Sequence, residues 1–322
     1  MNYKIEIISE DDHDIRLDRW FQRHYSHVSK GLVDKLARKG AIRLDGKRCK
    51  GGSRIAKGQE LRIPPSILNA EAIEPDEKPM ASPADIKLIK NAIIHEDRFI
   101  YVVNKPQGLA AQGGSGITRS LDVIMNAIAA EAGHSAHLVH RLDKDTSGII
   151  IVAKSPNVAA KLTKEFKSHD MRKIYLAVLK GCPRPYEGEI DMPLRKAGNI
   201  GEQKVIVDYE QGQKAVTLYQ MLENAGSQFS LVAFSPLTGR THQLRVHATE
   251  GLKCPIMGDG KYGGEEAFAN GIAKKLHLHA WQLHFKHPGS GEQVTYIAPL
   301  SDTLKQTLET LALSEPDTEL SD

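Results

Sequence analysis

A charged loop followed by an apolar run is the part of the sequence best suited to chemistry. Residues 140–148 read HRLDKDTSG, and residues 149–153 are all apolar. This pattern predicts a loop that enters a short buried strand, with Gly148 loosening the junction. Because buried charge is unfavourable unless it is paired, such a cluster belongs at or inside a cleft. The loop can equally be a solvated turn in which Asp145, Thr146 and Ser147 cap backbone groups, and spacing alone leaves both interpretations open.

Three other segments carry polar side chains next to predicted strands. Residues 104–108 (NKPQG) form a turn after the strand predicted at 99–103, and residues 173–177 (KIYLA) lie within a strand that alternates cleanly from 172 to 180. Residues 239–247 (GRTHQLRVH) follow a turn of Pro, Leu, Thr and Gly. These segments must position the charged loop and whatever it acts on.

The segment from Arg240 to Ala248 has a pattern that separates its two arginines. If it is helical, Arg245 shares a face with Thr241, Leu244 and Ala248 and points inward. An inward arginine needs a carboxylate partner, and Asp143 is the obvious candidate. An outward, phosphate-binding role fits Arg240 better.

The charged loop resembles the signature loop of the RluA-type pseudouridine synthases, whose pattern is HRLD, two variable residues, then TSG. The NKPxG, KxYxA and GRTHQLRVH segments match further motifs of that family, in the family's order. The resemblance implies that Asp143 is the catalytic carboxylate, that Tyr175 packs against the target base beside it, and that Arg245 pairs with Asp143. It also implies a set of substrate-binding residues, namely Arg141, Asn104, Lys105, Arg240 and His242.

The implied reaction converts uridine in RNA to pseudouridine. The N1–C1′ bond breaks, the base turns, and a C5–C1′ bond forms, with no cofactor, metal or redox change. The target base must leave its stack before Asp143 can reach it, and by resemblance Arg141 fills the vacated space. The family commonly has His where this chain has Gln112, which leaves the role of that side chain open. The glycine-rich segment 112–116 could approach a phosphate through its backbone amides, but it is not a P-loop.

Charge is distributed unevenly along the chain of 322 residues. Between Arg16 and Arg62 there are 14 Lys/Arg and four Asp/Glu, a net charge of +10, against +3 for the whole chain. A basic segment on an otherwise acidic chain indicates polyanion binding. Ser29 is the predicted N-cap of its second helix, and Asp45 and Gly46 are a predicted turn in its small β unit. The two predicted helices and the β unit resemble the S4 RNA-binding domain, although a charged solubilising domain is an alternative. The expected RNA-binding residues here are Arg19, Lys35, Arg38, Lys39 and Arg43.

The fold expected from these resemblances is α+β. A mostly antiparallel central sheet, flanked by helices and loops, forms the catalytic domain at 84–313, and a small α/β S4-like domain spans 1–63. A Pro-rich linker is predicted at 64–83 and a disordered acidic tail at 314–322. Strands are also predicted at 204–207, 215–222 and 229–234, as a meander.

Composition limits the other possibilities. No apolar run approaches the ~20 residues of a membrane span or forms a signal peptide. The three cysteines lie far apart in sequence, which favours a reducing cytoplasm over a disulfide framework. His277 and His279 have metal-ligand spacing but no nearby acidic or Cys ligand. We therefore expect a cytoplasmic, monomeric enzyme that needs neither metal nor cofactor.

The S4-containing enzymes that modify large-subunit rRNA, particularly the RluC type, show the greatest resemblance. The expected partner is ribosomal RNA or an assembling large subunit. Two other classes remain open: an inactive RNA-binding assembly factor, and a carboxylate-dependent hydrolase of nucleosides or nucleic acid. The intact Asp143, Tyr175 and Arg245 argue against the first, and the lack of an evident general acid argues against the second.

Overall fold

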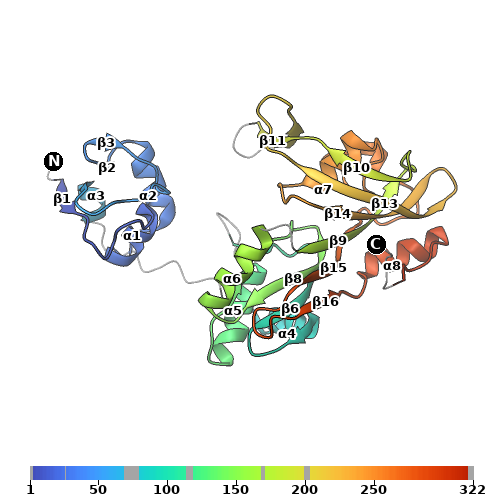
Figure 1. Ribbon diagram of the computed structural model, residues 1–322, viewed down its shortest axis with the longest axis horizontal. Coiled ribbons are helices and arrows are strands. Elements are labelled where there is room, and N and C mark those ends of the chain that lie inside the picture. Colours follow the sequence, from blue (N-terminus) through green and yellow to red (C-terminus); the bar gives the residue numbers. More distant parts are fainter. Residues whose placement is uncertain are drawn as a thin grey trace. The chain divides into compact units, whose positions relative to one another are not determined.

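The computed structural model describes residues 3–25, 27–68, 80–113, 119–167, 171–198 and 204–317. The chain divides into two compact units, residues 1–78 and 79–322, whose elements are labelled in Figure 1. Each unit has hydrophobic cores of its own.

The first unit packs its helices against a four-stranded sheet with the strand order β1-β4-β2-β3. Its elements are β1 (Lys4–Ile7), α1 (Leu17–His24), α2 (Lys30–Arg38), β2 (Arg43–Leu44), β3 (Lys47–Arg48), β4 (Glu60–Ile63) and α3 (Pro65–Leu68). Trp20 and Phe21 of α1 fill the core, together with Val33 of α2 and Leu61 of β4.

Local sequence explains where these elements begin and end. The Ser29 hydroxyl accepts a hydrogen bond from the Leu32 amide and caps α2, as predicted. Asp45 and Gly46 both have positive φ and form the two-residue turn between β2 and β3, which is the conformation that an Asp-Gly pair favours.

The boundary predicted at residue 63 is too early. Residues 65–68 form α3, and Ile67 is fully buried in the core of the first unit. An apolar residue between prolines reads as linker composition, whereas its burial depends on tertiary packing. Residues 69–79 of the predicted linker and 318–322 of the predicted tail lie outside the described residues.

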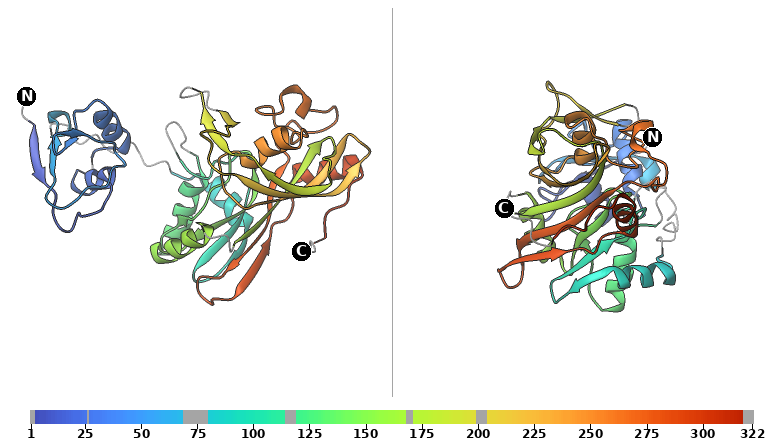
Figure 2. Two further views of the ribbon diagram at one scale, coloured as in Figure 1. Left: turned by 45° about the horizontal axis from the view of Figure 1, so that its top comes forward. Right: turned by 90° about the vertical axis from the view of Figure 1, so that its right-hand side faces the viewer.

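The second unit is built on a ten-stranded sheet, which confirms the predicted mostly antiparallel α+β architecture. The strand order is β10-β13-β14-β9-β15-β8-β6-β5, with β16 beside β15 and β7 beside β8. Figure 2 shows the twist of this sheet. The strands are β5 (Ile93–Glu96), β6 (Ile100–Lys105), β7 (His137–Leu138), β8 (Ser147–Ala153), β9 (Arg172–Lys180), β10 (Glu187–Asp191), β13 (Val216–Ala225), β14 (Phe229–Pro236), β15 (Leu278–Lys286) and β16 (Gln293–Ile297).

Helices cover both faces of this sheet. They are α4 (Pro83–Ala92), α5 (Leu121–Glu131), α6 (Pro156–Lys167), α7 (Gln243–Val246) and α8 (Asp302–Leu311), with a π-helical turn at His247–Gly251 and a 3₁₀ turn at Gly264–Ala267. Ile150 and Val152 of β8 pack with α4 and α5, and Ile149 and Ile151 pack with α6. Because successive side chains of a strand point to opposite faces, β8 is buried on both sides.

Strand β9 bears out its predicted alternation. Leu176 and Val178 pack on one face with α8, while Ala177 and Leu179 pack on the other with Leu244 of α7. Tyr175 lies on that second face. The α7 side of β9 is therefore where functional side chains from different motifs can meet.

One predicted strand is misplaced, and one predicted helix is shorter than expected. Residues 204–207 form β12 (Lys204–Val207), which pairs only with β11 (Leu194–Ala197) in a separate two-stranded sheet. The helix begins at Gln243 instead of Arg240, so Thr241 is exposed while Arg245 is buried as predicted. Within the described ranges, no helix is both long and apolar enough to cross a membrane.

Gly148 sits where the sheet requires a residue without a side chain. The start of β8 pairs in parallel with the start of β15, with Gly148 opposite Ala280. Gly148 has a φ of +108°, and a Cβ there would collide with the Ala280 carbonyl. Glycine therefore permits the parallel pairing that brings the 140–147 loop beside the beginning of β15.

Candidate active site

The sheet register brings the separate motifs to one place. Gly148 of β8 lies opposite Ala280 of β15, Ala280 lies opposite Tyr175 of β9, and Tyr175 lies opposite Phe234 of β14. The loop that carries Asp143 precedes β8, and the segment that carries Arg245 follows β14. This row of four paired residues therefore places three motifs around one point.

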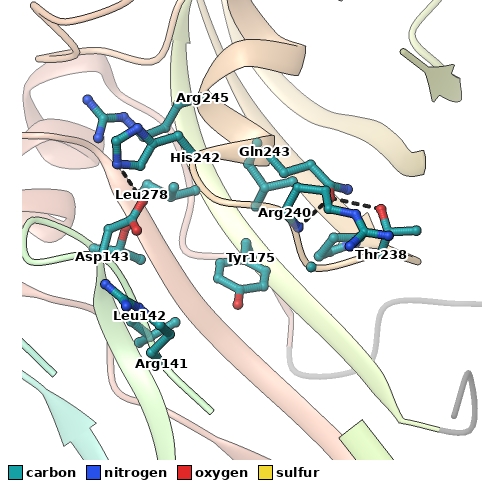
Figure 3. Close-up of a pocket in the computed structure, with 14 residues that line it drawn as sticks. Arg141, Leu142, Asp143, Tyr175, Thr238, Arg240, His242, Gln243, Arg245 and Leu278 are labelled. Carbon is teal, nitrogen blue, oxygen red and sulfur yellow. Dashed lines mark hydrogen bonds and ion pairs between the residues drawn. The ribbon is translucent and has the colours of Figure 1, made fainter. Parts of the chain in front are cut away.

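A pocket opens at this point (Figure 3). Its cavity volume is about 120 Å³, and its lining combines the three motifs: Arg141, Leu142, Asp143, Thr146, Tyr175, Pro236, Thr238, Gly239, Arg240, His242, Gln243, Leu244, Arg245 and Leu278. Because a cavity on the order of 150 Å³ can hold a benzene ring, the pocket suits a single pyrimidine ring.

Asp143 presents its carboxylate to this pocket. Its side chain is 25% exposed, and its Oδ2 lies 3.7 Å from Nε2 of His242. The Asp143 carbonyl accepts a hydrogen bond from the Thr146 amide, which closes a turn in the loop. The loop lines a pocket, as one interpretation expected. It also contains a turn, but Thr146 and Ser147 are buried, so the solvated turn of the other interpretation is not what forms.

Lys105 anchors this loop and does not bind substrate, contrary to the prediction. The side chain is fully buried, and its ammonium donates to the carbonyls of Pro106, Leu109 and Lys144. Burial lowers the pKa of Lys105 to about 8, although Asp145 and Asp143 act to raise it. A buried ammonium with three backbone acceptors cannot reach RNA, so its role is to fix the loop.

The neighbouring residues of the NKPQG motif also hold the backbone. The Gln107 side-chain amide donates to the carbonyls of Asp145 and Leu276, which ties the loop to the start of β15. The Asn104 side-chain amide donates to the Pro299 carbonyl, and its expected substrate-binding role stays a prediction. The glycine-rich 112–116 segment lies largely outside the described residues.

Arg245 points inward, but its partner is Asp259 and not Asp143. The guanidinium makes two hydrogen bonds to Asp259, of 2.8 and 2.6 Å, and both side chains are buried. Burial acts to lower the pKa of Arg245, but the hydrogen bonds to Asp259 outweigh it and the pKa is raised. Asp143 was predicted because it was the carboxylate already identified in the motifs. Folding instead brings Asp259, from another loop, closer to Arg245.

Tyr175 is half-buried with its ring against the pocket (Figure 3). Burial raises the pKa of its hydroxyl, and the Asp143 carboxylate raises it further. The hydroxyl is therefore protonated at neutral pH. It can donate a hydrogen bond or pass on a proton, but it is not a tyrosinate base in the resting enzyme.

His242 and Arg240 lie on opposite sides of the same turn. Arg240 is exposed and donates to the Lys214 carbonyl and the Gln213 side chain. His242 faces Asp143 inside the pocket. The prediction of a surface RNA contact therefore stays open for Arg240, but the His242 ring lies against the carboxylate.

A larger groove, of about 930 Å³, adjoins the pocket. It shares Arg141, Tyr175, Thr238, Gly239 and Arg240 with the pocket and adds His140, Phe166, Lys173, Glu189, Lys214, Val216 and Leu237. Four of these residues are Lys or Arg and one is Glu, so the groove presents positive charge. A polyanionic strand would be attracted along it.

Burial lowers the pKa of two groove residues, His140 and Lys173, for which no role was predicted. His140 stacks on Phe166 at 4.2 Å and accepts a hydrogen bond from the Ile151 amide. Burial, assisted by the nearby Lys173, lowers the pKa of His140 to about 3, so this imidazole is neutral and structural. Burial also lowers the pKa of Lys173, whose strand position, two residues before Tyr175, puts both side chains on one face.

The predicted RNA-binding residues of the first unit are distributed along its surface. Arg19 on α1 is exposed, as are Lys35, Arg38 and Lys39 around the end of α2. Arg43 differs because its guanidinium donates to the carbonyls of Gly40 and Gly46. Arg43 therefore closes the β2–β3 turn, and the exposed cations of α1 and α2 are the better candidates for phosphate contacts.

Sequence reasoning missed two further residues of the site, Asp259 and Tyr262. The Tyr262 hydroxyl forms a hydrogen bond with His242, and the Tyr262 ring lies beneath the Arg245 guanidinium. Asp259 forms an ion pair with that guanidinium. Both lie in a loop without regular structure. The predicted inward position of Arg245 indicated that a carboxylate must lie beside it. Periodicity does not indicate which carboxylate this is.

His277 and His279, which have metal-ligand spacing, are buried and engaged within the fold. His277 contacts Thr307 at 2.8 Å, and His279 contacts Ser147 at 2.9 Å. Among the residues that the structure describes, no group of three or more His, Cys, Asp or Glu side chains could hold a metal ion.

Known proteins with similar sequences carry one activity in their names. Residues 99–250 match the RNA pseudouridylate synthase family. The "Ribosomal large subunit pseudouridine synthase C" of Salmonella typhimurium is 34% identical over 316 residues, which cover 96% of each chain. The protein of that name from Rickettsia bellii is 35% identical over 289 residues, or 88% of this chain and 94% of the relative.

Solved structures agree. The structure titled "Human RNA Pseudouridylate Synthase Domain Containing 4" has a TM-score of 0.61 at 29% identity and covers 72% of this chain and 97% of its own. "Human RNA Pseudouridylate Synthase Domain Containing 1" has a TM-score of 0.54 at 26% identity, covering 74% and 100%. The predicted resemblance is confirmed, and the chain belongs to the RNA pseudouridylate synthase family as an RluA-type enzyme.

Proposed function

We propose that this enzyme converts specific uridines of large-subunit ribosomal RNA to pseudouridine, with Asp143 as the catalytic carboxylate. One observation carries the proposal. The Asp143 carboxylate reaches a pocket of one-ring size, with the Tyr175 ring beside it, and this pocket opens into a basic groove. The names of the relatives support large-subunit rRNA as the substrate.

The carboxylate suits the chemistry. An ionised Asp143 can attack or stabilise an electron-poor C1′ or C6 of the nucleotide and then leave again. The N1–C1′ bond breaks, C5 bonds to C1′, and the proton lost from C5 is balanced by the proton gained at N1. The reaction is an isomerisation, so it needs no redox partner or energy donor.

Tyr175 gives the base a surface and a proton-bearing hydroxyl. Its ring lines both the pocket and the groove, where it can stack on a flipped uracil. The protonated hydroxyl can donate to a uracil carbonyl or take part in moving the C5 proton. Tyr175 is therefore proposed as a proton relay and not as a tyrosinate base.

The groove is the proposed path of the RNA strand that flanks the target. Arg141, Lys173, Lys214 and Arg240 line it and would contact phosphates on either side of the flipped nucleotide. Arg141 lines both pocket and groove, so it is placed to fill the gap that the flipped base leaves. The first unit, with Arg19, Lys35, Arg38 and Lys39 exposed, would dock a neighbouring part of the RNA.

The proposal also includes a monomeric, cytoplasmic enzyme that uses no cofactor. Large-subunit rRNA is made and assembled in the cytoplasm of bacteria, and the isomerisation balances within one nucleotide. Sedimentation of the purified chain with and without RNA would detect a dimer, which would contradict the monomer.

The direct test is tritium release from RNA labelled at C5 of uridine. Purified enzyme should release tritium from large-subunit rRNA and not from small-subunit rRNA. The Asp143→Asn variant should retain RNA binding and lose turnover, because the amide has the same shape but is not nucleophilic. More than a few per cent residual turnover would contradict the role of Asp143.

Product analysis separates the remaining alternatives. Digested product RNA should contain pseudouridine and an intact backbone. Free uracil would instead indicate a hydrolase, and binding without any tritium release would indicate an inactive assembly factor. Mapping pseudouridines in rRNA from cells that lack the protein would identify the target positions.

A further inference from the structure

Among the residues that the structure describes, His242 has the side chain that pairs with the Asp143 carboxylate. Its Nε2 lies 3.7 Å from Asp143 Oδ2, and the side chains of His242 and Asp143 are 20% and 25% exposed. Figure 3 shows the imidazole between Asp143 and Arg245. Since Arg245 is committed to Asp259, His242 occupies the place that the sequence had assigned to the arginine.

The far side of the imidazole is held by Tyr262. The Tyr262 hydroxyl lies 2.6 Å from His242 Nδ1 and accepts a hydrogen bond from the Val205 amide at 3.1 Å. The Arg245 guanidinium lies over the Tyr262 ring, 5.0 Å from its centre. Tyr262 is thus fixed by its neighbours and in turn restricts the orientation of His242.

These contacts select one tautomer of the imidazole. An ionised carboxylate can only accept hydrogen bonds, so the nitrogen that faces Asp143 should carry the proton. Nδ1 is then the acceptor, and the Tyr262 O–H donates to it. Val205 occupies a lone pair of the Tyr262 oxygen, which leaves the hydroxyl proton free for this bond.

The backbone at His242 supports a positioning role. His242 has a φ of +52°, in the left-handed region, immediately before α7. Few residues other than glycine adopt this conformation, although histidine does so more often than most, and surrounding contacts hold it there. The Val246 amide donates to the His242 carbonyl and fixes the turn.

The surroundings keep His242 neutral. Burial lowers its pKa, and the positive charges nearby lower it further, although the two carboxylates oppose this. The groups that face it are Asp143, Asp259, Arg245, Lys261 and Tyr262. A neutral imidazole can donate its Nε2 proton towards Asp143 without neutralising the carboxylate.

We propose that His242 is a positioning residue for the isomerisation, which aims the Asp143 carboxylate by directing an Nε2 proton at its Oδ2, while Tyr262 holds the imidazole. The separation of 3.7 Å exceeds a hydrogen bond, and catalytic contacts of this kind commonly tighten when substrate binds. The inference rests on the proposed function only in taking Asp143 as the catalytic carboxylate.

A pair of amide variants tests which nitrogen matters. In His242→Gln the amide nitrogen can reach the place of Nε2, whereas in His242→Asn it lies near the place of Nδ1 and cannot reach Asp143. We expect His242→Asn to lower kcat by about 100-fold, the size typical of a misplaced reacting group, with KM for RNA unchanged. His242→Gln should recover most of that loss. Equal kcat values for the two variants, or a loss confined to KM, would overturn the proposal.

Tyr262→Phe tests the other end of the contact. This variant removes the hydroxyl and keeps the ring beneath Arg245, so we expect a smaller fall in kcat, of about 10-fold, the effect of losing one hydrogen bond. Circular dichroism and thermal melting should show that each variant is folded. A Tyr262→Phe variant with wild-type kcat would remove Tyr262 from the proposal.

A measurement without substrate keeps the inference separate from the proposed function. Long-range ¹H–¹⁵N spectra of the free enzyme should show the Nε2–H tautomer of His242. The pKa of His242 should fall in Asp143→Asn, because the Asp143 carboxylate raises it. An Nδ1–H tautomer or an unchanged His242 titration would overturn the inference. If these spectra are as expected while the enzyme is inactive on large-subunit rRNA, the proposed substrate fails and the His242–Asp143 contact stands.

Discussion

The Arg245 guanidinium and the Asp259 carboxylate form a buried, two-bonded ion pair across 14 residues of sequence. Asp259 Oδ1 also accepts hydrogen bonds from the amides of Lys261 and Tyr262. The pair therefore fixes the turn that presents Tyr262 to His242. Arg245 can therefore influence the active site in two ways. It holds the turn that carries Tyr262, and its positive charge lies near Asp143.

Removing Arg245 should destabilise the fold through Asp259. Arg245→Met leaves the Asp259 carboxylate buried without its partner, and we expect a loss of about 3–5 kcal/mol in the free energy of unfolding. Arg245→Met/Asp259→Asn should recover a large part of that loss, whereas Arg245→Met/Asp143→Asn should not. Chemical denaturation of the three variants gives the coupling energies. Recovery with Asp143→Asn instead would restore the originally predicted pair.

The sequence predicted those parts of the structure that depend on local chemistry. Ser29 caps a helix, Asp45 and Gly46 turn a hairpin, and β9 alternates because short-range preferences and periodicity decide these features. The inward orientation of Arg245 also follows from periodicity. Its partner does not, because a buried arginine specifies only that some carboxylate must approach, and the topology selects Asp259.

The role of Lys105 was wrongly predicted because it depends on burial. Lys105 lies in a turn-like segment, which indicates an exposed binding surface. In the structure, the Lys105 ammonium instead donates hydrogen bonds to three loop carbonyls. A buried loop must satisfy its backbone acceptors, but only the folded structure shows which side chain does so.

Lys105→Met should weaken both stability and turnover without affecting RNA affinity. The substitution removes the ammonium donor from three carbonyls, of which Lys144 keeps the Gly108 amide. We therefore expect a loss of about 1–3 kcal/mol in the free energy of unfolding at neutral pH, together with a lower kcat because the Asp143 loop is released. Lys144→Met is the matched control, since Lys144 is exposed on the same loop. A raised KM with unchanged kcat would restore the RNA-binding role.

The same lysine should give the stability a defined dependence on pH. The folded-state pKa of Lys105 is about 8, below the value of about 10.4 expected in an unfolded chain. Between these values the unfolded state binds more protons, so the wild-type stability should rise with pH. The difference between wild type and Lys105→Met should therefore grow as pH increases from about 8 to about 10. If the difference in unfolding free energy between wild type and Lys105→Met is constant over this range, folding does not lower the pKa of Lys105.

Tyr175→Phe should separate base stacking from proton transfer. The variant keeps the ring, so RNA affinity should be unchanged, while kcat should fall by about 10²–10⁴-fold if the hydroxyl handles a proton. Since burial and Asp143 raise the pKa of Tyr175, the wild-type hydroxyl should remain protonated beyond the ordinary tyrosine pKa of about 10. Spectrophotometric titration of wild type against the variant measures this directly. Full activity in Tyr175→Phe would leave the residue as a stacking platform only.

The exposed cations around the end of α2 should supply part of the salt-dependent attraction to RNA. Net charge is +10 from Arg16 to Arg62, whereas residues 79–322 contain 27 Lys/Arg and 27 Asp/Glu, so the second unit has no net charge to attract a polyanion over a long range. In Lys35→Gln/Arg38→Gln/Lys39→Gln, each lost phosphate contact should flatten the plot of log Kd against log salt by about 0.7–0.9. RNA binding at several salt concentrations measures the slope, and kcat at saturating RNA should stay near wild type.

A triple variant of the second unit controls for net charge alone. Lys274, Lys275 and Lys286 are exposed and do not line the pocket or the groove, so changing all three to Gln removes the same formal charge. Charges separated by more than a Debye length of about 8–10 Å are largely screened. Lysines that do not contact a phosphate should therefore contribute little to RNA affinity. The control should therefore keep the wild-type salt slope. Equal slopes for the two triple variants would mean that α2 does not contact the RNA and that the first unit acts only through its overall charge.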